Sequence, residues 1–230
     1  MLQQTGTERV EEKFAQFLRA FPDVQSLSQA SPTAVLRIWK GLGYNRRALS
    51  ILKSAKEIVL RHGGNVPRTF RELQELPGIG AASAGAIAAF AFNRPAVFIE
   101  TNIRRVFLHF FFPGAHEVRD AEILPFVERT LDRRNPREWY HALMDYGAML
   151  KSKIPNPNRR SAHYARQPAF EGSRRQIRGK ILDALLGSDS LTIYGLGRAA
   201  GRKAGEITGV VKDLMEEGFL TKSGSRFSLS

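Results

Sequence analysis

The stretch that decides the fold is Glu75-Leu76-Pro77-Gly78-Ile79-Gly80. Pro77 cannot continue a helix from the residues before it, and Gly78 and Gly80 permit a tight turn with exposed backbone N–H groups. The apolar, small-residue segment 81–92 then predicts a helix whose positive N-terminal end lies at this turn. Such a turn binds a phosphate without a basic side chain. The stretch therefore predicts a helix–hairpin–helix element.

A single carboxylate follows this element, in the segment Ile99-Glu100-Thr101-Asn102. Glu100 lies at the entry to a helix predicted over residues 101–112. It has two interpretations, a catalytic acid or a side chain that caps this helix. Asn102 is likewise either a partner of that acid or an ordinary polar residue in the first helical turn.

The hairpin and the acid together resemble the signature of the HhH-GPD superfamily of DNA glycosylases. Four further segments resemble its MutY-type, adenine-specific branch, in the same order and at similar spacing. They are Met1-Leu2-Gln3-Gln4-Thr5, Phe21-Pro22, Trp39–Ala48 and Met144–Met149. The resemblance covers residues 1 to about 152 and implies a mainly α fold of two helical lobes with a DNA cleft.

The chain is predicted to divide into a glycosylase core at 1–152, a basic linker at 153–173 and a winged helix-turn-helix at 174–230. The core shows only helical patterns. The tail reads as helix, short strand, two helices and a hairpin, which is the winged-helix order. It does not resemble the nudix-like module with which MutY enzymes inspect oxidised guanine, so the opposite base is left open.

Composition points to a polyanionic partner. The chain has 35 basic and 22 acidic residues, a net charge of +13 and a pI near 10.5, which favours nucleic acid, here double-stranded DNA. Residues 151–180 hold nine basic residues and one acid, and we expect them to run beside the DNA backbone; the alternative is a dimerisation wing. No apolar run is long enough for a membrane span, so a cytoplasmic monomer that does not bind membranes is expected.

The chain has no cysteine. Disulfides and thiolate metal sites are therefore excluded. The iron–sulfur cluster that many relatives carry just after the segment 144–149 is excluded as well, so other contacts must hold that region. No cofactor is expected to be required. The resemblance implies only a sodium or potassium ion at the hairpin, held by the backbone carbonyls of Gln74, Leu76 and Ile79.

The resemblance implies hydrolysis of the N-glycosidic bond of a flipped base, adenine opposite guanine or oxidised guanine. Glu100, where the family carries aspartate, would stabilise the cationic sugar, with Asn102 beside it. Bifunctional relatives place a lysine nucleophile where this chain has Ala82, so a monofunctional enzyme is expected. Two alternatives remain: a mismatch-specific thymine or uracil glycosylase, and a catalytically inactive DNA-binding protein of the same fold.

MutY-type enzymes protonate the departing adenine with a glutamate two residues before the segment that starts here at Met1. We therefore expect the natural protein to begin upstream of Met1. The other interpretation is a substrate base that leaves without protonation.

Candidate DNA contacts also follow from the resemblance. Gln4 matches the glutamine that fills the vacated base stack, with Gln3 beside it; an exposed position at a helix start is the alternative. Tyr44 matches an aromatic position of the family and could contact DNA, although core packing explains it too. Arg46 could meet a phosphate, although a solvated helix face is the alternative. The remaining candidates lie at the hairpin and on the helix after Glu100: Pro77, Gly78, Gly80, Ala82, Ser83 and Arg104.

Overall fold

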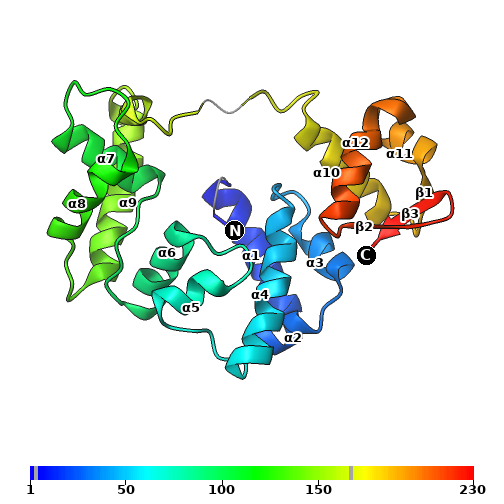
Figure 1. The fold of residues 1–230 in the computed structure, drawn as a ribbon, viewed down its shortest axis with the longest axis horizontal. Coiled ribbons are helices and arrows are strands. Elements are labelled where there is room, and N and C mark those ends of the chain that lie inside the picture. Colours follow the sequence, from blue (N-terminus) through cyan, green and yellow to red (C-terminus); the bar gives the residue numbers. More distant parts are fainter. Residues whose placement is uncertain (3–4, 166–167) are drawn as a thin grey trace. The chain divides into compact units, whose positions relative to one another are not determined.

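A computed structural model describes residues 1–2, 5–165 and 168–230 (Figure 1). Its internal contacts divide the chain into two compact units. The terminal unit joins Met1–Val66 with Pro168–Ser230, and the central unit is Pro67–Gln167. Both are built mainly of helices, which confirms the predicted fold class.

In its first half, the described residues of the terminal unit form four helices, which pack around Trp39, Leu36 and Val35. Ser31 caps the third helix by accepting a hydrogen bond from the Ala34 N–H at 3.1 Å, with Pro32 in the first turn. Gly63 ends the fourth in the left-handed conformation. The helices are α1 (Thr7–Ala20), α2 (Val24–Ser28), α3 (Pro32–Trp39) and α4 (Arg46–His62).

The second half of the terminal unit is a winged helix-turn-helix, as the sequence predicts. Its three strands form a sheet in the order β1-β3-β2, with Leu191 opposite Phe227 and Leu220 opposite Leu229. One hydrophobic cluster contains both its core and that of the N-terminal helices. Its elements are α10 (Arg174–Leu186), β1 (Leu191–Thr192), α11 (Ile193–Ala200), α12 (Ala204–Glu216), β2 (Leu220–Ser223) and β3 (Arg226–Leu229).

The central unit carries the hairpin and the acid. Its core is formed by Ile103, Leu108, Ile123, Val127 and Tyr140, all fully buried. Its elements are α5 (Phe70–Glu75), α6 (Ala81–Phe92), α7 (Thr101–Phe111), α8 (Asp120–Thr130), α9 (Pro136–Lys153) and the 3-10 helix η1 (Pro157–Arg160).

The helices predicted at 81–92 and 101–112 are found at Ala81–Phe92 and Thr101–Phe111. Helix α10 begins at Arg174, since Ser173 caps it by accepting from the Gln176 N–H. Thr192 caps α11 in the same way, so that helix begins at Ile193. Helix α2 was not predicted. None of the described helices is long and apolar enough to cross a membrane.

Candidate functional site

The hairpin of the central unit joins α5 to α6. Thr69 and Glu72 form a capping box at the start of α5. Gly78 has a φ of +78°, which favours glycine, and the Ile79 N–H closes the turn on the Leu76 carbonyl at 3.1 Å. Gly80 is the N-cap of α6 and provides no side chain to its first turn. The turn therefore presents the positive end of α6 to solvent.

Helix α6 packs closely against the segment that precedes Glu100. A Cβ on Gly85 would lie 2.6 Å from the Phe98 Cβ, so only glycine lets α6 approach this segment so closely. From the other side, the Tyr140 hydroxyl donates to the Ala96 carbonyl at 2.7 Å and accepts from the Phe98 N–H at 3.4 Å. Burial raises the pKa of Tyr140 to about 12, so the hydroxyl keeps its proton as a donor. The backbone before Glu100 is thus fixed on two sides.

Glu100 is the N-cap of α7. Its Oε1 atom accepts hydrogen bonds from the Asn102 N–H at 2.5 Å and the Ile103 N–H at 2.8 Å. Its Oε2 atom accepts none from the residues that the structure describes, and the side chain is half-buried. The cap interpretation and the catalytic one are therefore compatible, because capping uses one carboxylate oxygen and leaves the other for a ligand.

A buried arginine lies beside this acid. Arg105 is 3% exposed and donates to Asn102 Oδ1 at 2.7 Å, to Asn156 Oδ1 at 3.2 Å and to the Gly147 carbonyl. Burial lowers the pKa of the Arg105 guanidinium, and the nearby charge of Glu100 partly offsets this effect. Arg105 therefore orients the Asn102 side chain and places a positive charge near Glu100.

Gly147 in α9 permits this arrangement. A Cβ at this position would lie 2.8 Å from the Asn102 Cβ and would overlap the Asn102 carbonyl. The glycine of the Met144–Met149 segment thus lets α9 touch the first turn of α7.

The segment after α9 is held by polar side chains. Asn158 donates to the Thr101 carbonyl at 2.9 Å. Arg160 donates to the Leu108 and Phe112 carbonyls, each at 2.8 Å, and so satisfies the C-terminal end of α7. With the bond from Arg105 to Asn156, these contacts fasten the segment to α7 without any cysteine.

The other predicted residues of the central unit are placed as follows. Ala82 is exposed and Ser83 half-buried in the first turn of α6, and Pro77 lies in the turn itself. Arg104 binds Asp120 with two hydrogen bonds of 2.7 and 2.6 Å, and only 17% of its side chain is exposed. A phosphate would have to share this guanidinium with Asp120.

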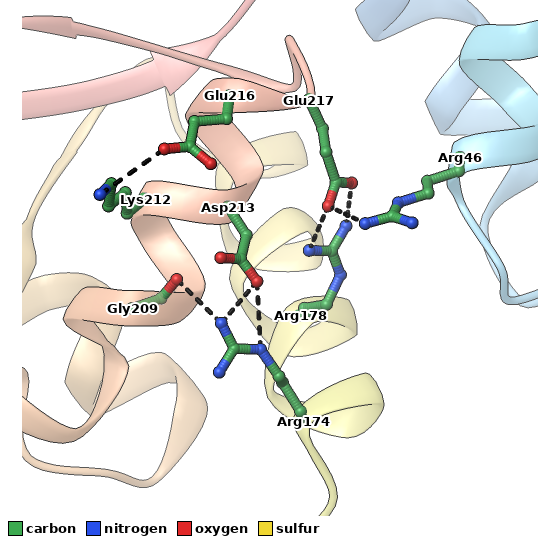
Figure 2. A network of polar contacts seen from close by, with 8 residues as sticks. All are labelled: Arg46, Arg174, Arg178, Gly209, Lys212, Asp213, Glu216 and Glu217. Carbon is green, nitrogen blue, oxygen red and sulfur yellow. Dashed lines mark hydrogen bonds and ion pairs between the residues drawn. The ribbon is translucent and has the colours of Figure 1, made fainter.

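Two predicted DNA contacts of the terminal unit touch the winged helix-turn-helix. The Arg46 guanidinium lies 2.5 Å from Glu217 Oε1, and Arg178 binds the same carboxylate (Figure 2). Arg175 donates to the Tyr44 hydroxyl at 3.3 Å. Hydrogen bonds from the two arginines lower the pKa of Glu217 to about 2. Gln3 and Gln4 lie outside the described residues.

The predicted ion ligands lie at the hairpin. The Leu76 carbonyl already accepts the Ile79 N–H, and Gln74 belongs to α5. In the part of the chain that the structure describes, no group of three histidine, cysteine or acidic residues is arranged to hold a metal.

The sequence analysis missed Arg105, Tyr140 and the polar residues of 156–160. Arg104 and Arg105 look alike in the sequence, yet the Arg104 side chain is 17% exposed and Arg105 is almost completely buried. The helical period places Arg105 between Ile103 and Val106 on the buried side of α7, and this was the signal that could have identified it.

Comparison with known proteins gives a consistent result. The family model described as "HhH-GPD superfamily base excision DNA repair protein" matches residues 1–123. Adenine DNA glycosylase of Buchnera aphidicola subsp. Baizongia pistaciae is 32% identical over 154 residues, 65% of this chain and 43% of that protein. The enzyme of Mycolicibacterium smegmatis is 32% identical over 201 residues, 80% of this chain and 69% of that protein. The chain thus spans less than half of the first relative's length.

Solved structures share the fold. A thermostable thymine-DNA glycosylase has a TM-score of 0.58 at 22% identity, covering 64% of this chain and 70% of that one. A trapped covalent complex of endonuclease III with DNA has a TM-score of 0.57 at 18% identity, covering 76% of each chain.

Proposed function

Because the chain belongs to the HhH-GPD superfamily of base excision DNA repair proteins, we propose that it is a monofunctional DNA glycosylase. It hydrolyses the bond between a flipped base and its deoxyribose in double-stranded DNA. The base is adenine opposite guanine or oxidised guanine, in keeping with the adenine DNA glycosylases among its relatives.

The observation that carries the proposal is the geometry of Glu100. One carboxylate oxygen is tied to the start of α7, and the other accepts no hydrogen bond from a described residue. A carboxylate fixed in this way is preorganised to stabilise the positive charge that develops on the sugar. Its backbone is braced by Gly85 and Tyr140, and its neighbour Asn102 is held by Arg105.

The proposed reaction is a single displacement by water. The water oxygen bonds to C1′, the C1′–N bond breaks, and its electron pair leaves with the base, which takes up a proton from solvent, while the proton that Glu100 accepts later returns to solvent. Glu100 accepts the proton that the water loses. Helix α6 carries no lysine, and Ala82 offers no amine, so a Schiff base with the sugar is not part of this reaction.

The hairpin supplies the proposed anchor for DNA. The backbone N–H groups around Gly78, Gly80 and Ala82 would bind a phosphate of the strand, assisted by the dipole of α6. A sodium or potassium ion, if bound, would take the backbone oxygens of Gln74, Leu76 and Ile79, the hard ligands that such cations prefer. Its charge would add to the attraction of the turn for phosphate.

The test is a panel of duplexes with A opposite oxidised guanine, A·G, T·G, U·G and hypoxanthine. Base release is measured by chromatography, and strand cleavage is compared with and without alkali. The proposal expects free adenine from the first two duplexes, and strand breaks only after alkali. Release of thymine or uracil instead would show that the substrate base is a mismatched pyrimidine and not adenine. Strand breaks without alkali would contradict the monofunctional mechanism. No release from any duplex would favour a DNA-binding protein without catalysis.

A further inference from the structure

The winged helix-turn-helix has a tight, glycine-dependent turn between α11 and α12. A Cβ on Gly197 would lie 2.8 Å from the Arg202 carbonyl, so α11 can meet the turn only through a glycine. Gly201 adopts a φ of +67°, and the Arg202 N–H bonds back to the Gly197 carbonyl at 2.9 Å. The turn therefore holds α12 in the position of a recognition helix.

Two acids, Asp213 of α12 and Glu217 directly after this helix, form ion pairs with arginines (Figure 2). Arg174 binds Asp213 at 2.5 Å and the Gly209 carbonyl at 3.0 Å, while Glu217 binds Arg178 and Arg46. Arg174 and Arg178 belong to the basic run at 151–180, whereas Arg46 is the first residue of α4. Asp213 and Glu217 thus neutralise arginines that are distant in sequence and that we expected to lie beside DNA.

Five further cations of the domain have no such partner. No described acid forms an ion pair with them, and all are exposed. The Arg226 guanidinium donates to the hydroxyl and carbonyl oxygens of Ser190, and Lys222 lies over the Phe227 ring. They occupy α11, the turn and the hairpin: Arg198, Arg202, Lys203, Lys222 and Arg226.

A groove connects α12 to the hairpin. Its lining is largely apolar and includes the ion pair of Lys212 with Glu216, beside the polar Thr208, Lys222 and Ser225. Gly205 lies exposed in the first turn of α12, where a Cβ would meet no atom within 4 Å. The backbone of this turn can thus approach a ligand closely, and α12 contains no arginine, asparagine or glutamine that could read base edges.

We propose that this surface, formed by α11, the turn and the hairpin, is a second binding site for duplex DNA. It binds the phosphate backbone through Lys203, Lys222 and their neighbours, and it does not select sequence. The choice of DNA as the polyanion rests on the proposed function, whereas the location of the surface follows from the distribution of charge.

The test uses the full chain and an undamaged duplex, with affinity measured by fluorescence anisotropy over a range of salt concentrations. Lys203→Gln with Lys222→Gln removes two charges, whereas Lys203→Arg with Lys222→Arg keeps them. Capping of α12 is preserved, since the Lys203 backbone N–H provides the bond to Glu206. Lys53→Gln with Lys56→Gln removes two exposed charges from α4 as a matched control.

The glutamine pair at 203 and 222 is expected to flatten the slope of log affinity against log salt by about one unit per lysine, equally for unrelated sequences. The arginine pair and the α4 control should keep the wild-type slope. An unchanged slope in the glutamine pair, or an equal loss in the α4 control, would overturn the proposal. A loss of affinity that is confined to one DNA sequence would overturn it too. Base release at saturating protein is measured in parallel, and its failure would concern the active site alone.

Discussion

Gly147 meets Asn102 so closely that no larger residue fits: a Cβ on Gly147 would lie 2.8 Å from the Asn102 Cβ. The same glycine offers its carbonyl to Arg105, which also binds the Asn102 side chain. A helix remote in sequence therefore determines where the first turn of α7 lies, and with it the backbone N–H groups that bind Glu100.

Gly147→Ala tests this contact. The added methyl group has to displace α7 or α9, which we expect to destabilise the protein by about 1–3 kcal/mol and to slow base release. Gly179→Ala is the matched control, because its Cβ meets nothing within 4 Å in the middle of α10. Thermal melts of the control should show equal or higher stability, by up to about 1 kcal/mol. Equal stability of the two variants would contradict the close approach.

The bridge between Glu217 and the two arginines gives a prediction about pH. The substitution Glu217→Gln removes the charge that accepts hydrogen bonds from Arg46 and Arg178. We expect it to lower the free energy of unfolding by roughly 1.5–3 kcal/mol. The contribution of Arg46 is the smaller part, because 73% of its side chain is exposed. The neighbouring Glu216→Gln is the control, since Glu216 is 64% exposed and pairs only along its own helix.

The sign of the pH dependence follows from the lowered pKa. Glu217 has a folded-state pKa of about 2 instead of 4.5, so its stabilising effect is complete above about pH 4.5 and is lost as the pH falls toward 2. The difference in melting temperature between wild type and Glu217→Gln should therefore be constant at neutral pH and shrink in acid. A difference that grew in acid would refute the bridge.

Gly80 gives a prediction about DNA affinity. Its φ is −88° and its Cβ would meet no atom within 4 Å, so a larger side chain is compatible with the fold. Gly80→Leu should nevertheless cover the N–H groups of α6 and weaken binding to any duplex by about tenfold, the loss of one hydrogen bond to a charged group. Gel-shift titrations with damaged and undamaged duplex measure this. Unchanged affinity in a folded variant would make the hairpin purely structural.

The sequence was sufficient for features that depend on neighbouring residues. Pro77 with Gly78, and Glu100 before α7, carry their own local signals, and the structure places each as expected. The contacts of Arg46 could not be predicted, because Glu217 lies 171 residues away and nothing local indicates the pairing.

At the site itself, the sequence did not show which of two adjacent arginine side chains is buried. Arg104 and Arg105 are adjacent and chemically alike, but packing of α9 against α7 makes one a partner of Asp120 and the other a buried support for Asn102. Only the tertiary fold distinguishes them.

The most direct test of the account is the rate of base release under single-turnover conditions in Glu100 variants. Glu100→Gln keeps an oxygen that can accept the Asn102 and Ile103 N–H groups but removes the charge, while Glu100→Asp restores the acid that the family carries. We expect the glutamine variant to lose on the order of a hundredfold or more in rate while binding duplex as tightly as wild type, and the aspartate variant to retain activity. Release of adenine by Glu100→Gln at the wild-type rate would contradict the assignment of Glu100 as the catalytic carboxylate.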